Sequence, residues 1–232
     1  LQPYHLELIE MKRVLLFLSI LLIAMSWPAS VKTIHIQKTG KVHFKVDQLH
    51  ESKDVPWGMV FISSNKLLFT EQAGFVKMLD VDTREVISVG SVAGVRNRSQ
   101  GGLMDVAIPP GFKPGSWIYF TYSKTVSGGA ATTLARAKIQ NNRLVNWKDL
   151  LITKSTSTAG VHYGSRIAFD GKGHLFFTIG DRGTRENAQD LRVHAGSVLR
   201  VNDDGTVPDG NPFALVNSAL PEIWSYGHRN PQ

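Results

Sequence analysis

The amino-acid sequence predicts an all-β fold, a β-propeller built from four-stranded blades. Three observations carry this prediction: helical patterning is almost absent after residue 30, short apolar runs alternate with turn residues, and the runs come in groups of four. Runs rich in Val, Ile, Leu, Phe, Tyr and Thr, separated by Gly, Asn, Asp and Pro, are typical of strands joined by turns. The first group of expected strands is Met59–Ser63, Lys66–Thr70, Phe75–Leu79 and Glu85–Val89.

Two further groups of four follow along the chain. The second is Leu103–Ile108, Trp117–Tyr122, Thr132–Ile139 and Trp147–Ile152, and the third is Ser165–Phe169, His174–Gly180, Ser197–Asn202 and Glu222–Tyr226. Each group opens on a glycine, at Gly58, Gly102 and Gly164. Four-stranded units that repeat every 40–50 residues or so are typical of propeller blades. A β-sandwich or a jelly roll stays the alternative.

Composition excludes several other classes of protein. Hydrophobic residues make up 42% of the 232 residues and charged residues 19%, which is enough apolar material for a core and excludes a fully disordered chain. The absence of cysteine excludes a disulfide framework, a thiolate metal site and a cysteine nucleophile. The net charge of +7 comes without a run of Lys or Arg, so we expect a basic surface or an anion pocket and no nucleic-acid partner.

The N-terminal segment has the pattern of a secretory signal peptide. Met11 is followed by Lys12 and Arg13, then by the apolar run Val14–Met25 and by small residues. The run is too short for a comfortable membrane span, which needs about 20 residues. We therefore expect cleavage between residues 26 and 30, no stable membrane span afterwards, and a periplasmic or secreted protein. An uncleaved N-terminal anchor is the alternative.

The predicted domain organisation is simple. Residues 1–30 are an upstream extension and the signal peptide, and residues 31–232 are the N-terminal part of a single β-propeller domain. Thr33–Gln48 has strand character and is a candidate closing strand for the last blade. The chain stops at Gln232, where a fourth blade should begin, and three blades leave two open edges that proteins normally avoid. We therefore expect the chain to be a piece of a longer propeller, inactive by itself.

Unusual polar residues fall on one predicted face of the propeller. Strands alternate in direction within a blade, so loops between blades emerge on the same face as loops joining the second and third strands. This rule brings together Gln100, His162, Asp181 and the run His228–Asn230. Amides, an imidazole, a carboxylate and a guanidinium predict a site for an anionic, planar or polyhydroxyl ligand.

His162 and Asp181 are the predicted catalytic pair. An imidazole can take a proton in a transition state, and a carboxylate behind it fixes the tautomer and stabilises the imidazolium. Arg229 suits a carboxylate or oxyanion because its planar fork binds such groups with two hydrogen bonds. The alternatives, an ordinary loop histidine and an arginine that bonds loop carbonyls, stay open at this point.

Longer strings of residues go beyond these patterns. They are Gln100–Ala107, His162–Arg166, Ile179–Gly183, Ala188–Leu191, Gly196–Asn202, Asp209–Phe213 and, most specific of all, the terminal run Glu222–Gln232. Together they resemble the glucose/sorbosone dehydrogenase family and, more narrowly, its soluble aldose sugar dehydrogenases, which depend on pyrroloquinoline quinone (PQQ). The resemblance runs from about Val55 to the last residue.

The resemblance implies a six-bladed propeller, of which about three blades are present, with PQQ and Ca²⁺ as cofactors. His162 would be the general base that takes the proton of the anomeric hydroxyl while hydride passes from C1 of an aldose to the quinone and a lactone forms. Asp181 would orient His162, Arg229 would stabilise negative charge on the quinone, and Gln100 and Asn230 would be further cofactor contacts. The metal ligands are expected beyond Gln232, and an external electron acceptor would reoxidise the cofactor.

One departure from the family pattern bears on the substrate. Val161 precedes His162 where some glucose dehydrogenases of the family carry an acid, which favours a broad aldose enzyme. Two other functions stay open at this point. One is a non-catalytic propeller that binds a ligand or protein on the same face, and the other is a propeller lactonase or lyase that uses His162 and a metal.

Overall fold

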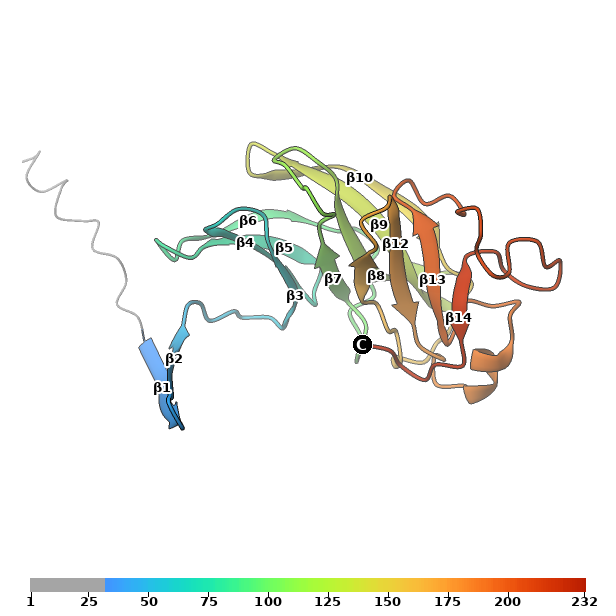
Figure 1. Ribbon diagram of the computed structural model, residues 1–232, viewed down its shortest axis with the longest axis horizontal. Coiled ribbons are helices and arrows are strands. Elements are labelled where there is room, and N and C mark those ends of the chain that lie inside the picture. Colours follow the sequence, from blue (N-terminus) through green and yellow to red (C-terminus); the bar gives the residue numbers. More distant parts are fainter. Residues whose placement is uncertain (1–31) are drawn as a thin grey trace, which may run out of the picture. The chain divides into compact units, whose positions relative to one another are not determined.

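Three four-stranded antiparallel sheets make up residues 50–232 in the computed structural model, which describes residues 32–232 (Figure 1). Within each sheet every strand pairs with the next along the chain. The first sheet contains β3 (Pro56–Phe61), β4 (Lys66–Glu71), β5 (Phe75–Asp80) and β6 (Val86–Ser91). The second contains β7 (Leu103–Ala107), β8 (Ile118–Val126), β9 (Gly129–Gln140) and β10 (Arg143–Ile152). The third contains β11 (Ile167–Phe169), β12 (His174–Ile179), β13 (Ser197–Asn202) and β14 (Ile223–Tyr226).

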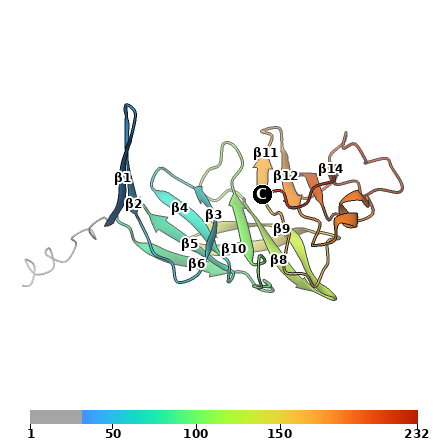
Figure 2. The same ribbon diagram turned by 90° about the horizontal axis from the view of Figure 1, so that it is seen from below.

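These sheets confirm the three predicted groups of four strands and the partial propeller. Figure 2 shows them following one another in chain order from a second direction. The ends of individual strands differ from the prediction by a few residues. β11 begins at Ile167 instead of Ser165, because Ser165 has a φ of 89°, in the left-handed region that cannot continue a strand. A short 3₁₀ helix, η1 (Arg185–Gln189), lies between β12 and β13.

The N-terminal part of the described chain forms a unit of its own. β1 (Lys32–Thr39) and β2 (Val42–Gln48) pair as an antiparallel two-stranded sheet. The segment Thr33–Gln48 is therefore a hairpin and not one continuous strand, and its use as a closing strand stays a prediction. The predicted signal peptide lies outside the described residues. Within residues 32–232 no helix is long and apolar enough to cross a membrane.

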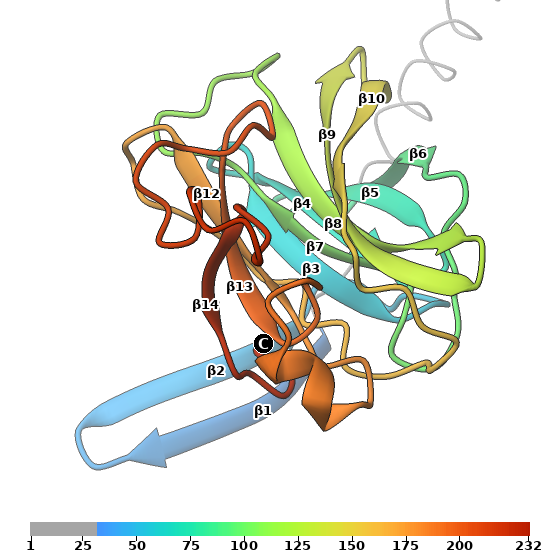
Figure 3. The same ribbon diagram turned by 90° about the vertical axis from the view of Figure 1, so that its right-hand side faces the viewer.

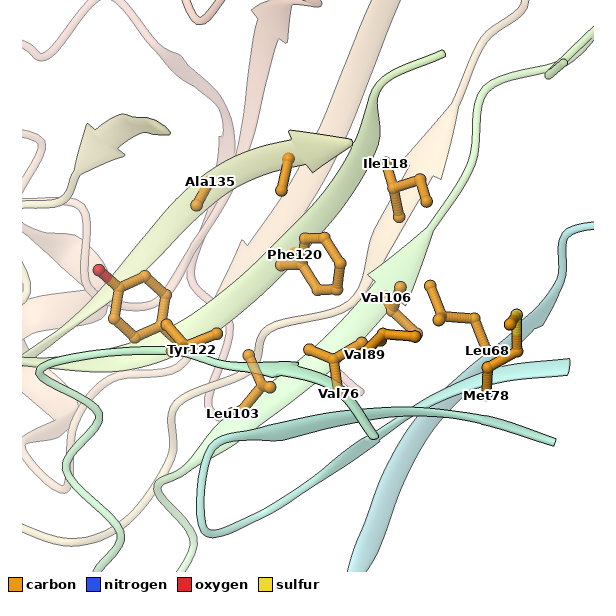
Figure 4. Close-up of a cluster of buried hydrophobic side chains, with 12 residues drawn as sticks. Leu68, Val76, Met78, Val89, Leu103, Val106, Ile118, Phe120, Tyr122 and Ala135 are labelled. Atoms are coloured by element: carbon orange, nitrogen blue, oxygen red, sulfur yellow. The ribbon is translucent and has the colours of Figure 1, made fainter. Parts of the chain in front are cut away.

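Neighbouring sheets pack face to face through apolar side chains. Period-two alternation shows this on β12, where Leu175, Phe177 and Ile179 are buried and the residues between them are partly exposed. Figure 4 shows the cluster between the first and second sheets, in which Leu68 and Val76 meet Val106 and Phe120. A second cluster joins the next pair of sheets, through Tyr119, Leu134, Leu175, Phe177, Ile179, Leu199, Val201 and Ile223. Each blade thus covers a face of its neighbour, as the sequence predicts.

A threonine near the end of the second strand repeats in every blade. Thr70, Thr121 and Thr178 each follow a phenylalanine, on β4, β8 and β12. Each hydroxyl accepts a hydrogen bond from a backbone N–H at the start of its own blade, from Gly58 at 3.0 Å, Asp105 at 3.2 Å and Arg166 at 3.0 Å. Each also donates to the carbonyl where the following segment begins, at Met104 (2.5 Å), Ser165 (2.7 Å) and Pro231 (2.8 Å). We call this arrangement the threonine latch.

The latch explains a local break in the sheet. In the first two blades the register between first and second strands shifts where the latched residues lie, so the backbone groups there leave the regular ladder. A buried N–H or C=O without a partner is costly, and one threonine hydroxyl satisfies one group of each kind. Gly58 belongs to the same junction, since a Cβ on it would lie 2.9 Å from Cα of Asp105. The latch thus fixes where each blade begins relative to the one before it.

A buried histidine ties the segment after β12 to the loop between β10 and β11. Nδ1 of His194 accepts a hydrogen bond from the Lys154 N–H at 2.9 Å, and the His194 N–H donates to the Lys154 carbonyl at 3.0 Å. Nε2 of His194 therefore carries the proton and donates to Oε2 of Glu222 at 3.1 Å. This hydrogen bond, together with the charge of Lys154, lowers the pKa of Glu222 below its ordinary value.

The threonine latch predicts the effect of replacing Thr121, which is fully buried. Thr121→Val keeps the shape of the side chain but leaves the Asp105 N–H and the Ser165 carbonyl without their hydrogen-bond partner. Leaving one buried polar group unpaired costs about 1–3 kcal/mol, so the loss of unfolding free energy should reach at least that range. Urea denaturation measures it. Thr125→Val, at an exposed position of the same strand, is the matched control, and equal effects of both substitutions would refute the latch.

The lowered pKa of Glu222 predicts a dependence of stability on pH. A carboxyl whose pKa is lowered in the folded state adds stability above its unfolded pKa and loses that contribution as the pH falls. The melting temperature of the unsubstituted protein should therefore drop further between about pH 7 and about pH 4 than that of Glu222→Gln. Glu85→Gln removes an exposed carboxyl and should leave the drop unchanged. An equal drop in Glu222→Gln would contradict the assignment.

Candidate functional site

Loops from four parts of the chain meet at one end of the second and third blades. Gln100 lies in the β6–β7 loop, His162 in the β10–β11 loop and Asp181 directly after β12, while Arg229 and Asn230 follow β14. The Gln100 N–H donates to the Gly160 carbonyl at 2.9 Å, and the Asp181 N–H donates to the Arg229 carbonyl at 2.8 Å. Figure 3 shows η1 and the C-terminal residues at this end of the third sheet. The structure thus brings together all five site residues that the sequence predicts.

Gly180 makes this crossing possible. A Cβ on Gly180 would lie 2.3 Å from the His162 carbonyl oxygen and 2.8 Å from that of Arg229. Real Cβ atoms do not approach backbone oxygens so closely, so only glycine lets both segments pass here. The string Ile179–Gly183 is one of those that carry the family resemblance, but nothing in it indicates that two distant segments cross at Gly180.

His162 and Asp181 form a hydrogen-bonded pair. Nδ1 of His162 lies 2.7 Å from Oδ1 of Asp181, and the two side chains are only 13% and 3% exposed. Oδ1 also accepts the Gly183 N–H at 2.7 Å, which fixes the carboxylate. An ionised carboxylate can only accept, so Nδ1 carries a proton, and in the neutral imidazole Nε2 keeps its lone pair. Nε2 has no hydrogen-bond partner among the described residues, and the arrangement leaves a nitrogen base available to a ligand.

The backbone of His162 is held in an uncommon conformation. Its φ of 54° lies in the left-handed region, which costs on the order of 1 kcal/mol for a residue with a side chain. Oε1 of Gln100 accepts the His162 N–H at 2.8 Å and so helps to hold it. Such strain persists only when surrounding contacts determine it, and it is frequent at functional sites.

Gln100 and Asn230 present amide N–H groups at the site. Their amide oxygens accept backbone N–H groups, those of His162 at 2.8 Å and Gly164 at 3.0 Å. The side-chain NH₂ groups therefore point away from these bonds, and neither has a partner among the described residues. The exposed guanidinium of Arg229 likewise makes no hydrogen bond or ion pair within residues 32–232. One cation and two amide donors thus remain available to a ligand.

A cavity of about 250 Å³ adjoins these donors. Gln100, Asn230, Trp57, Tyr163, Gly164 and Gln232 line it, whereas His162, Asp181 and Arg229 do not. A larger open hollow of about 840 Å³ lies along β3, β7 and β11 and contains none of the predicted site residues. Among residues 32–232 no group of three or more His, Asp or Glu side chains gathers in a way that could hold a metal ion.

Arg182 is the main site residue that the sequence reasoning missed. Its side chain is 1% exposed and lies beneath the loop that carries His162. Arginine is almost never fully buried, and nothing in the sequence indicates that the one directly after Asp181 is. Trp57 was missed as well, because it lies on the first blade, far from the other site residues in sequence.

The donors and the base fit a planar or polyhydroxyl ligand that carries negative charge. Nε2 of His162 is able to accept a proton, the guanidinium of Arg229 is able to bind an anionic group, and the two amides are able to donate to oxygen atoms. Comparisons with known proteins narrow this description. The family model for glucose/sorbosone dehydrogenases matches residues 53–232.

Three relatives illustrate the likeness. The aldose sugar dehydrogenase YliI of Escherichia coli is 34% identical over 191 residues, covering 81% of this chain and 52% of its own. Quinoprotein glucose dehydrogenase B of Acinetobacter calcoaceticus is 26% identical over 212 residues, covering 76% and 42%. The crystal structure of the soluble E. coli aldose sugar dehydrogenase in its apo form matches with a TM-score of 0.74 at 29% identity, over 88% of this chain and 55% of that one.

The chain therefore spans about half the length of the relatives that it matches. Its three sheets correspond to part of a propeller that the relatives share, and the family match covers most of the chain. On this evidence, the chain belongs to the glucose/sorbosone dehydrogenase family.

Proposed function

We propose that the protein containing this chain oxidises the C1 hydroxyl of aldose sugars to lactones, with PQQ as the hydride acceptor. The His162–Asp181 pair carries the proposal, because it presents an imidazole nitrogen beside donors that have no partner within residues 32–232. The names of two relatives support it, one an aldose sugar dehydrogenase and the other a quinoprotein. Since the chain is about half as long as these relatives, the activity is proposed for the full-length protein.

The free donors suit PQQ, which carries carboxylates and neighbouring quinone oxygens. Arg229 would bind such oxygens with its planar fork, and the amides of Gln100 and Asn230 would donate to others. When bound, the quinone supplies an acceptor for two electrons, which leave C1 as hydride. We also propose a calcium ion held by residues beyond Gln232, an external electron acceptor, and export from the cytoplasm by the segment Met11–Ser30.

His162 performs the proton transfer in this proposal. Nε2 takes the proton of the anomeric hydroxyl as the C1–H bond gives up its electron pair, so the sugar loses two electrons and two protons in all and becomes a lactone. Asp181 stabilises the imidazolium that forms and holds Nδ1 in the donor state. The 2.7 Å contact and the low exposure of both groups make that stabilisation stronger than it would be in water.

Replacing His162 tests the base. His162→Gln should bind PQQ normally but lose about 10²–10⁴-fold in turnover at saturating sugar, the usual contribution of a general base. Asp181→Asn should also slow the reaction, because a neutral amide stabilises the imidazolium poorly. Steady-state dye reduction with several aldoses measures both.

A second histidine–aspartate pair provides the control. His174 and Asp170 lie 2.6 Å apart at the other end of β12, and His174→Gln should leave turnover within about threefold. A loss under threefold in His162→Gln would rule out His162 as the base.

Replacing Arg229 tests the cofactor contact. Arg229→Lys keeps the charge but not the planar fork, so PQQ titrations should show weaker reconstitution and turnover should fall. Arg143→Lys, on an exposed strand end of the second blade, should behave like the unsubstituted protein. Coincident titration curves for Arg229→Lys and Arg143→Lys would place Arg229 outside the site.

A further inference from the structure

A buried cation without an acidic partner lies next to the His162–Asp181 pair. Arg182 is 1% exposed, and all its hydrogen bonds in the described residues go to backbone carbonyls. Burial lowers its pKa, because taking a charge out of water is unfavourable. A buried charge is tolerated only when good hydrogen bonds offset the loss of water. The segments that accept the hydrogen bonds of Arg182 are therefore held firmly in place.

The guanidinium of Arg182 joins two separate segments. Nη1 donates to the Ala130 carbonyl on β9 at 2.9 Å and to the Ser155 carbonyl at 2.8 Å. Nη2 donates to the Ala159 carbonyl at 2.8 Å and Nε to the Val161 carbonyl at 3.1 Å. β9 is an inner strand of the second blade, so the loop from Ser155 to Val161 is fastened to a rigid element.

The same guanidinium contacts both chain neighbours of His162. It bonds the carbonyl of Val161 on one side, and its carbon lies 3.8 Å from the centre of the Tyr163 ring on the other. A cation over an aromatic face is attractive, the more so when both are buried. Asp181, the residue before Arg182, meanwhile holds Nδ1 of His162. One dipeptide thus fixes the ring of His162 through a carboxylate and its backbone through a guanidinium.

We propose that Arg182 is a positioning residue for His162. By holding Val161 and Tyr163 it maintains the left-handed backbone of His162, which sets the direction of Nε2 and the contact of Nδ1 with Asp181. The proposal rests on the proposed function for its kinetic consequence. An ammonium group cannot replace the guanidinium, because it lacks the planar fork that reaches four carbonyls at once.

The kinetic test is a double-variant cycle in the full-length protein, with rates per PQQ bound. Arg182→Lys should lower turnover about 10–100-fold with KM for the sugar within about threefold, since misplacing a base by about 1 Å has effects of this size. In a His162→Gln background the same substitution should cost less than about twofold. Arg192→Lys, at an exposed arginine of the same segment that pairs with Asp190, should leave turnover unchanged. An equal loss in both backgrounds, or none, would overturn the proposal.

A spectroscopic test does not depend on activity. The Nδ1 proton of His162 should give a low-field proton resonance, identified by its loss in His162→Gln. In Arg182→Lys it should move upfield or exchange faster with water, while in Arg192→Lys it should persist. An unchanged resonance would overturn positioning by Arg182. An inactive wild-type protein whose resonance depends on Arg182 would instead refute the dehydrogenase and leave the positioning role intact.

A milder variant covers the case in which Arg182→Lys does not fold. Tyr163→Leu keeps the four hydrogen bonds and removes the ring that the guanidinium faces. Faster exchange of the His162 resonance in this variant supports the proposal. A resonance identical to that of the unsubstituted protein would show that the contact with the Tyr163 ring does not position His162, and would overturn that part of the proposal.

Discussion

The threonine latch is the interaction on which the rest of the described propeller depends. One hydroxyl satisfies the N–H of its own blade and the carbonyl of the following segment, and this happens three times along the chain. Apolar packing between blades supplies most of the stabilisation but is tolerant of small shifts, whereas a hydrogen bond is not. The latch fixes the position of each blade relative to the one before it, an offset that packing alone would leave variable. The same bonds fix the position of the loops at the end of each blade.

The candidate site is a direct product of that offset. His162 lies three residues before the latched carbonyl of Ser165, and Arg229 lies two residues before that of Pro231. Thr178, which bonds Pro231, is itself three residues before Asp181. His162, Asp181 and Arg229 each lie within three residues of a latch residue. The distances between them are therefore set by the inner strands and not by the outer parts of the loops. This arrangement is the kind of preorganisation that catalysis needs.

Much of this was predictable from sequence, for identifiable reasons. Short apolar runs separated by turn residues located the twelve strands of the three sheets, and strand direction placed Gln100, His162, Asp181, Arg229 and Asn230 at one end. The roles of Arg182 and Gly180 were not predictable, because they depend on which backbone atoms from distant segments come near. The latch could have been predicted, because the pairs Phe69–Thr70, Phe120–Thr121 and Phe177–Thr178 repeat at equivalent places in the three predicted blades. They were unrecognised because threonine is an ordinary strand residue.

The spacing of the latch has an evolutionary consequence. The threonine and the carbonyl that it binds are separated by 34 residues in the first blade, 44 in the second and 53 in the third. The intervening chain thus differs in length from blade to blade, while the bonded atoms keep the same arrangement. Insertions and deletions in these stretches change the rim of the site while its inner wall keeps its register. Changes in loop length alone can therefore alter which side chains surround the site, at little cost in the stability of the fold.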